Sequence, residues 1–135
     1  MKCISVKCKD NSSNVLVNID SYNNVYIRDD IVSFLKNNSG GYPIKNVVMF
    51  DNEEYEIRAF LSLDEQDKHY FIEKPLKYFL NKTKGKIIPI GLDSGSNYYC
   101  VNNDTGKVYF WCSEEDVYYL IAESLNDFVE IILNS

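Results

Sequence analysis

The segment from Ile87 to Trp111 constrains the fold more than any other part of the chain, because it has the pattern of a β-hairpin that follows an apolar strand. A short apolar run at 87–91 ends in a turn, and strand-like segments follow at 97–102 and 107–112. The residues between them, Asn-Asp-Thr-Gly at 103–106, favour a tight turn because asparagine and glycine tolerate its backbone angles. We therefore predict an antiparallel pair of strands here.

Pairing residue 102 with residue 107 decides which side chains of this hairpin share a face. Both faces are then apolar, and a hairpin with two apolar faces is predicted near the centre of a sheet that is covered on both sides. Cys100 would lie opposite Tyr109 rather than Cys112, so no disulfide across the hairpin is expected. One face carries Tyr98, Cys100, Tyr109 and Trp111, and the other carries Tyr99, Val101, Val108 and Phe110.

Amphipathic helices are predicted in three places, where apolar residues recur at i, i+3 and i+4. The first begins after Asp29 or Asp30, either of which can cap a helix with its carboxylate, and ends at 37–41. The second has Pro75 in its first turn, and the third begins after Ser124 as a capping residue. The predicted buried stripes are Ile31, Phe34 and Leu35; Leu76, Phe79 and Leu80; and Leu125, Phe128, Val129, Ile132 and Leu133.

Further strands are predicted at 45–50, 54–62 and 117–121 from their apolar or alternating character. The alternation of 54–62 is interrupted by Phe60, which is either a surface anchor or a contact to a helix. Residues 1–24 are predicted to form a hairpin rather than a weak helix, because β-branched residues, Asn and Asp disfavour helices. The whole chain is therefore predicted to be a single α+β domain, with a mainly antiparallel, twisted sheet of about six strands packed by about three helices.

The net charge of −6 limits the classes of partner. Most nucleic-acid-binding proteins are basic, so the charge argues against binding nucleic acid. No apolar run reaches the length of about 18 residues that spans a membrane, and the N-terminus lacks the apolar region of a secretory signal, which favours the cytoplasm. The acidity favours a basic protein partner, although it can equally serve solubility alone.

The sequence carries no arrangement of residues that is typical of catalysis. His69 is the only histidine and lies in a polar loop, so no serine or cysteine has a neighbouring base. Free thiols are expected and no zinc site, because Cys3, Cys8, Cys100 and Cys112 include no Cys-x-x-Cys pair. We therefore expect a protein that is not an enzyme and that holds no metal or cofactor.

One basic region stands out in this acidic chain. It is either the solvated face of the second helix or a phosphate-binding region, although the glycine-rich cradle of phosphate sites is missing. Its members are Lys74, Lys77, Lys82, Lys84 and Lys86.

The order of several short motifs resembles the SUKH superfamily of Smi/Knr-like domains, between about Ile27 and Leu133. This superfamily includes fungal cell-wall regulators and many bacterial immunity proteins. The resemblance implies an α+β fold without enzymatic activity and, for small bacterial members, the neutralisation of a toxin, often a nuclease. The motifs are Asn-Ser-Gly-Gly (38–41), Ile-Pro-Ile-Gly (88–91), Gly-Ser-Asn-Tyr-Tyr (95–99), Gly-Lys-Val-Tyr-Phe-Trp (106–111) and Ala-Glu-Ser-Leu-Asn-Asp-Phe (122–128).

The preferred hypothesis is a non-enzymatic immunity protein, a monomer or weak homodimer, that binds and neutralises a basic toxin domain. The alternative is a regulatory or scaffold module of the Smi/Knr type that binds an endogenous protein. The candidate contacts are aromatic anchors inside an acidic rim, a common plan for interfaces, and the alternative for the aromatic residues is ordinary core. They are Tyr98, Tyr109 and Trp111, with Asp51, Glu53, Glu54, Glu114, Glu115 and Asp116.

Overall fold

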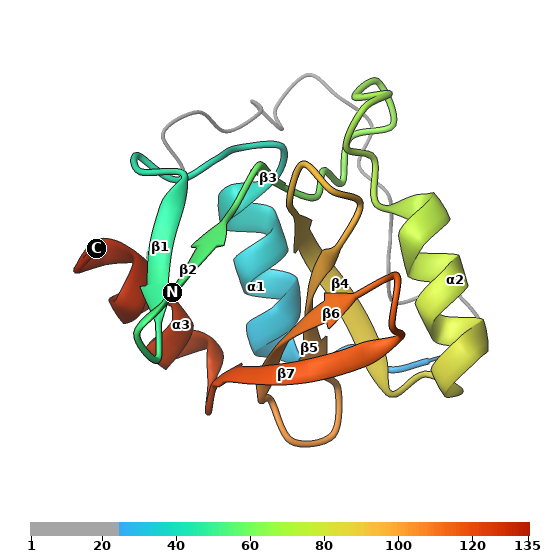
Figure 1. The fold of residues 1–135 in the computed structure, drawn as a ribbon. Coiled ribbons are helices and arrows are strands. Elements are labelled where there is room, and N and C mark those ends of the chain that lie inside the picture. The colour runs from blue at the N-terminus through green and yellow to red at the C-terminus, as the bar shows by residue number, and fades with distance from the viewer. Residues whose placement is uncertain (1–24) are drawn as a thin grey trace.

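The computed structural model describes residues 25–135, so the hairpin predicted within 1–24 lies outside the described part. The described residues form an α+β domain with two antiparallel sheets, which confirms the predicted fold class (Figure 1). The helices are α1 (Asp29–Asn38), α2 (Glu73–Thr83) and α3 (Leu125–Leu133). The strands are β1 (Val47–Phe50), β2 (Glu53–Glu56), β3 (Ala59–Phe60), β4 (Ile87–Leu92), β5 (Tyr98–Asn102), β6 (Val108–Cys112) and β7 (Val117–Ala122).

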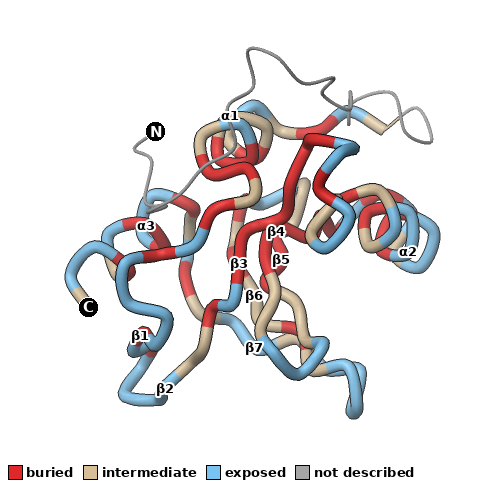
Figure 2. The backbone as a smooth tube through the Cα atoms, turned by 90° about the horizontal axis from the view of Figure 1, so that it is seen from above, coloured by how far each residue is buried: buried red, intermediate tan, exposed pale blue. Residues whose placement is uncertain are grey.

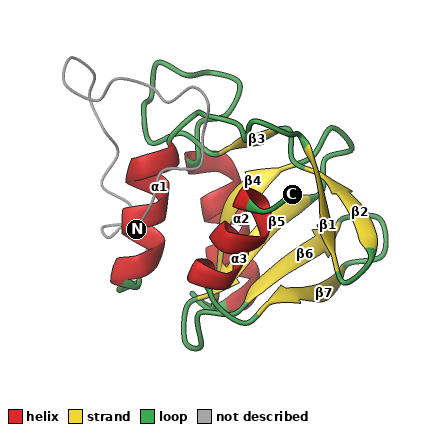
Figure 3. Ribbon diagram, turned by 90° about the vertical axis from the view of Figure 1, so that its left-hand side faces the viewer, coloured by secondary structure: helices red, strands yellow, loops and turns green. Residues whose placement is uncertain are grey.

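The larger sheet has the strand order β3-β4-β5-β6-β7, and β1 and β2 form a separate two-stranded sheet. The predicted hairpin register is correct, because Tyr98 lies opposite Trp111 and Val101 lies opposite Val108. Its central place is also confirmed, since β5 is the middle strand. Phe79 of α2 packs on one face of this sheet with Trp111, whereas α1, α3 and the β1–β2 sheet supply the main core, to which Leu76 and Leu80 of α2 also belong. Figure 3 shows β1 and β2 on the same side of the molecule as β6 and β7.

The predicted helices are present, and their starting points differ from the prediction in one case. The Ser124 hydroxyl accepts a hydrogen bond of 3.0 Å from the backbone N–H three residues on, which confirms it as the cap of α3. The capping prediction for α1 is wrong in position: the N-cap is Arg28, without a side-chain cap, although the Asp30 carboxylate accepts a hydrogen bond of 2.9 Å from the N–H of Ile31 in the first turn. Asp29 and Asp30 instead occupy the first turn, where their charge favours the positive end of the helix dipole.

The single strand predicted at 54–62 is wrong, because the chain changes sheets in its middle. The N–H of Ile57 donates to the carbonyl of Asn46 at 2.7 Å, on the side of β1. The next N–H, of Arg58, donates to the carbonyl of Leu92 in β4 at 2.8 Å. The segment is therefore divided into β2, which pairs with β1, and β3, which pairs with β4.

Aromatic rings from α1, β1, β3 and α3 meet in the main core. Figure 2 shows the buried residues of β3 and β4 in the middle of the molecule. Phe60 is fully buried, and its ring meets Phe34 of α1 edge to face, with centroids 5.3 Å apart. This identifies Phe60 as a contact to a helix, the second of the two predicted alternatives. Phe128 of α3 stacks on Phe50 of β1 at 5.6 Å. The last apolar position predicted for the buried face of α3 is wrong, because Leu133 is 45% exposed.

One tyrosine of the central strand connects the two sheets. The hydroxyl of Tyr99 donates to the backbone carbonyl of Glu56, the last residue of β2, at 2.6 Å. The carboxylate of Glu56 in turn accepts hydrogen bonds from the N–H and the hydroxyl of Ser94, at 2.9 and 2.6 Å. These bonds fix the β1–β2 hairpin relative to the larger sheet. No helix among residues 25–135 has both the length and the apolar character needed to cross a membrane.

Candidate functional site

The face of β5 and β6 that carries the predicted aromatic anchors is partly covered by α2. Trp111 is only 6% exposed, and its ring meets Phe79 of α2 edge to face at 5.0 Å. Tyr98 is half-buried, with its ring 5.8 Å from that of Phe79. Tyr109 is half-buried on the side of β7, where Leu120 lies opposite it and is 48% exposed. The face is therefore core beneath α2 and open towards β7.

An ion pair joins α2 to the start of β7 at the border of this covered part. Lys82 pairs with the Asp116 carboxylate and lies 4.9 Å above the Trp111 ring. The indole N–H of Trp111 donates to the same carboxylate at 2.7 Å. The hydrogen bond from Lys82, followed by that from Trp111, holds the pKa of Asp116 below its usual value. Asp116, which was predicted in the acidic rim, thus holds the turn and the helix together.

Two acidic turns lie near Tyr119, in the middle of β7. Glu115, in the turn between β6 and β7, accepts a hydrogen bond from the Tyr119 hydroxyl at 3.4 Å. The turn between β1 and β2 is followed by Glu53, the first residue of β2. The charge of Glu115 and then burial raise the pKa of Tyr119, and Glu53 makes the smallest contribution. Tyr55 of β2 contacts Phe110, which lies opposite Tyr119, so β2 and β7 lie near one another on this face.

The local sequence explains how the acidic β1–β2 turn is placed. Asp51 and Asn52 have φ values of 51° and 65°, which these residue types tolerate in a two-residue hairpin turn. Behind the turn, Tyr55 of β2 packs edge to face on Phe110 of β6, with centroids 5.3 Å apart. Of the predicted acidic rim, Glu115 and Glu53 therefore lie towards Tyr119, whereas Glu54 lies on the other face of β2, opposite Met49. The exposed members of the rim are Asp51, Glu53, Glu54, Glu114 and Glu115.

Two lysines of the basic region form ion pairs within the chain. Lys77 forms an ion pair with Glu73 one turn earlier, at 3.5 Å, and Lys82 pairs with Asp116. Lys84 has a φ of 57° and closes the C-terminal end of the helix, where positive charge is favourable. This arrangement favours the solvated helix face over a phosphate-binding region.

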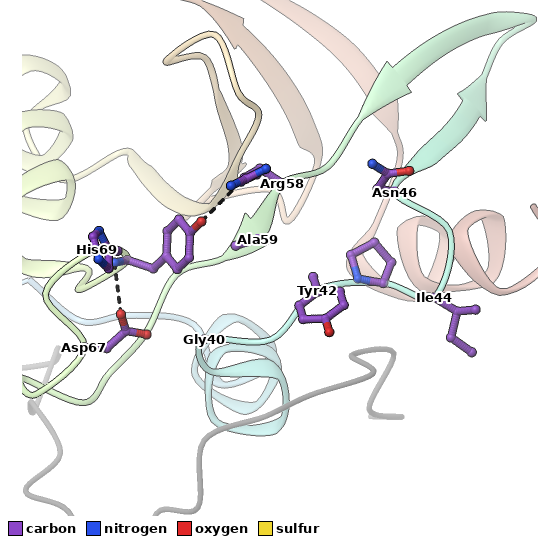
Figure 4. A pocket seen from close by; sticks show the side chains of 10 residues that line it. Gly40, Tyr42, Ile44, Asn46, Arg58, Ala59, Asp67 and His69 are labelled. Atoms are coloured by element: carbon purple, nitrogen blue, oxygen red, sulfur yellow. Dashed lines mark hydrogen bonds between the residues drawn. The ribbon is translucent and has the colours of Figure 1, made fainter.

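A pocket of about 580 Å³ lies at the opposite edge of the sheet, beside β3 (Figure 4). Three separate segments line it: the loop after α1 with Tyr42, the start of β3 with Arg58, and the loop before α2 with His69 and Tyr70. Arg58 donates to the Tyr70 hydroxyl at 3.3 Å, and Tyr70 donates its N–H to Asp67 at 3.2 Å. No local motif in the sequence predicts this pocket, because its three segments meet only in space.

The titratable residues expected to be inert have the following surroundings. His69 is exposed at the rim of the pocket. Cys100 is a fully buried free thiol, and this burial raises its pKa, whereas Cys112 is a half-buried free thiol. Cys3 and Cys8 lie outside the described residues. Within 25–135, no group of three His, Cys, Asp or Glu side chains is placed to hold a metal ion.

Comparison with known proteins agrees with this architecture. The profile of the SMI1 / KNR4 family (SUKH-1) matches residues 12–131, which is most of the chain. The chain belongs to this family. It is also similar to the SPbeta prophage-derived uncharacterized protein YokK of Bacillus subtilis (strain 168), with 32% identity over 65 residues. That match covers 45% of this chain and 34% of YokK, so it spans about a third of that protein's length. No solved structure matches the chain.

Proposed function

We propose that this SUKH-family domain is a cytoplasmic immunity protein, which binds a bacterial toxin domain with a basic surface and neutralises it by covering that surface. The observation that carries the proposal is the acidic surroundings of Tyr119: Glu115 accepts its hydrogen bond, and β2, which begins at the exposed Glu53, packs through Tyr55 on the neighbouring Phe110. Carboxylates gathered on one surface attract a partner of opposite charge and raise the rate of association. In this proposal the domain acts by binding alone, without catalysis and without a cofactor.

The surroundings of the acidic turns support a protein partner rather than a small cation. The acids lie beside exposed apolar side chains of β7, and aromatic or apolar anchors within a charged rim are typical of protein interfaces. Tyr119 is 43% exposed and Leu120 is 48% exposed. Leu120 and its cross-strand neighbour Tyr109 lie on the opposite face of the edge from Tyr119, so a partner at β7 would meet acidic groups on one face and apolar groups on the other. A nuclease whose substrate groove is basic would fit this distribution of charge and apolar groups.

The predicted contact residues divide into two roles in this proposal. Asp51, Glu53, Glu54, Glu114, Glu115 and Tyr109 would touch the toxin, because they are exposed or open towards β7. Trp111 and Asp116 would act beneath them, since the hydrogen bond between them and their contacts with Lys82 hold the β6–β7 turn in place. Tyr98 lies under α2 and would contribute through packing.

Co-expression with the product of the neighbouring reading frame tests the proposal. A variant with Glu53→Gln, Glu54→Gln and Glu115→Gln removes charge from the two acidic turns. A control with Glu65→Gln, Asp104→Asn and Glu130→Gln makes the same change in net charge at exposed positions elsewhere. The first variant should associate roughly tenfold more slowly at low salt and lose protection, whereas the control should keep both.

Two results would contradict the proposal. If the unmodified chain neither binds the neighbouring product nor protects cells from it, the immunity role is refuted. If both charge variants lose binding equally, net charge rather than this surface governs the association, and the assignment of the surface fails.

A further inference from the structure

The two edges of the five-stranded sheet are built differently. At one edge, β3 spans only Ala59–Phe60, and the N–H of Phe60 already donates to the carbonyl of Gly41 at 2.8 Å. At the other edge, β7 spans Val117–Ala122 and pairs with β6 on its inner side. Among residues 25–135, no strand lies on the outer side of β7, which forms the margin of the sheet in Figures 1 and 3. One edge is therefore short and partly covered, and the other is long and open.

The sequence of β7 lacks the features that normally protect an open edge. Proteins prevent unwanted pairing at such edges with lysine, proline or very short strands. β7 reads Val-Tyr-Tyr-Leu-Ile-Ala, without a charged residue or a proline. Val117, Tyr119 and Leu120 are 38%, 43% and 48% exposed. An uncharged edge rich in β-branched and aromatic residues is suited to receive another strand, which would bind through main-chain hydrogen bonds.

The two faces beside this edge differ in chemistry. Tyr119 shares its face with Phe110, and there its hydroxyl donates to Glu115, while β2, which carries Glu53, packs on Phe110 through Tyr55. Leu120 points to the other face with Tyr109, which is aromatic and apolar. Successive side chains of a docked strand point alternately to these two faces. Such a strand would therefore place Lys or Arg on the Tyr119 side and apolar residues on the Leu120 side.

A second copy of this chain fits the edge poorly. Two copies would each carry a net charge of −6 and repel one another. An antiparallel alignment of two β7 strands, with Val117 opposite Ala122, would place Asp116 of each copy opposite Glu123 of the other. Like charges directly opposite each other in a sheet are destabilising. The charge pattern therefore favours a basic partner over self-pairing.

From these observations we infer that β7 is a docking edge, which adds a strand of a partner protein whose residues alternate between basic and apolar. The inference rests on the proposed function for the identity of the partner, and it names the part of the surface that the partner contacts. The occupant is an extended segment of the toxin domain, with basic side chains towards the two acidic turns.

Two short synthetic peptides of identical composition test the docking edge directly. One alternates, Lys-Val-Lys-Leu-Arg-Val-Lys, and the other has its basic and apolar residues in separate blocks. Because only the alternating peptide can match both faces, it should bind roughly tenfold more tightly by titration calorimetry. Hydrogen exchange should show outward β7 amides that exchange fast in the free protein and slowly in the complex. Leu120→Lys should abolish this preference, whereas Ile44→Lys, at an 85% exposed position beside the pocket, should keep it.

The results separate the inference from the proposed function. Equal binding of the two peptides, or β7 amides that are already slow in the free protein, would overturn the docking edge. A toxin that is bound and neutralised equally well by the Leu120→Lys variant would also overturn it, and would leave the immunity role intact. Selective binding of the alternating peptide, without neutralisation of any neighbouring product, would support the docking edge and refute the immunity role.

Discussion

Replacing Tyr99 with phenylalanine tests how the acidic β1–β2 turn is held beside the larger sheet. The substitution removes one hydroxyl and keeps the ring, whose contacts with Phe110 and Phe128 have centroid distances of 5.2 and 6.2 Å. The lost hydrogen bond to the Glu56 carbonyl measures 2.6 Å. Removing such a donor costs about 1–2 kcal/mol, since the carbonyl is left without its partner. For a domain of this size the midpoint of thermal unfolding should fall by about 3–7 °C.

The same variant should respond differently to alkaline pH. Burial, and then the charges of Asp93 and Glu56, raise the pKa of Tyr99 above its usual value. Below the unfolded pKa of about 10 its contribution to stability is fully present, and it is lost as pH rises because only the unfolded chain releases the proton. At about pH 11 this loss amounts to about 1.4 kcal/mol. Since phenylalanine has no proton to release, the difference in unfolding free energy between the two proteins should shrink by that amount.

Urea unfolding at neutral pH and at about pH 11 measures both effects. The control is Tyr42→Phe, at a 42% exposed position, which should leave the unfolding free energy unchanged within about 0.5 kcal/mol. A Tyr99→Phe protein as stable as the parent at neutral pH would refute the role of the hydrogen bond. A difference that stays constant up to pH 11 would refute the argument from burial.

Two further predictions concern the region covered by α2. Phe79→Ala removes a fully buried ring that contacts Trp111, so it should lower the free energy of unfolding, measured in urea, by about 3–5 kcal/mol. Truncation of Tyr78 beside it, which is 49% exposed, should lower it clearly less. Equal losses in the two variants would contradict the packing described for α2. In a chain whose two N-terminal cysteines are replaced by serine, Cys112 should react with a thiol reagent roughly tenfold faster than Cys100 or more. The reason is that the Cys100 thiol is buried and its pKa is raised. Mass spectrometry of the labelled peptides measures the two rates, and the opposite order would contradict this burial.

The hairpin was predictable because its information is local. The segment 103–106 supplies a turn of fixed length, and Gly106 adopts a φ of 82° that other residues rarely accept. The loop length then fixes the register, and the register fixes both faces. Helix positions were predictable for the same reason, because each apolar stripe repeats within a few turns. The N-cap of α1 was less predictable, because several adjacent polar residues can accept hydrogen bonds from the same first-turn amides.

The errors arise where distant segments decide the outcome. The alternation within 54–62 shows no break at the change of sheets, because Ile57 and Ala59 are buried on either side of it; its interruption at Phe60 comes only afterwards. The switch is visible only in long-range hydrogen bonds, such as that from Arg58 to Leu92 of β4, 34 residues later. The same is true of the pair between Lys82 and Asp116. Local sequence patterns indicate which residues are buried and with what periodicity. They do not indicate which distant segment buries them.

The position of α2 explains why the aromatic face was hard to assign either to the core or to a partner. α2 packs against β4 and β5 and covers Trp111, so that part of the face stabilises the fold. It does not reach the outer side of β7, where Leu120 stays exposed. The pair between Lys82 and Asp116 lies at this boundary and neutralises the lysine nearest to the acidic turns. Because that positive charge is held internally, the carboxylates around Tyr119 keep their attraction for a basic strand that approaches the open edge.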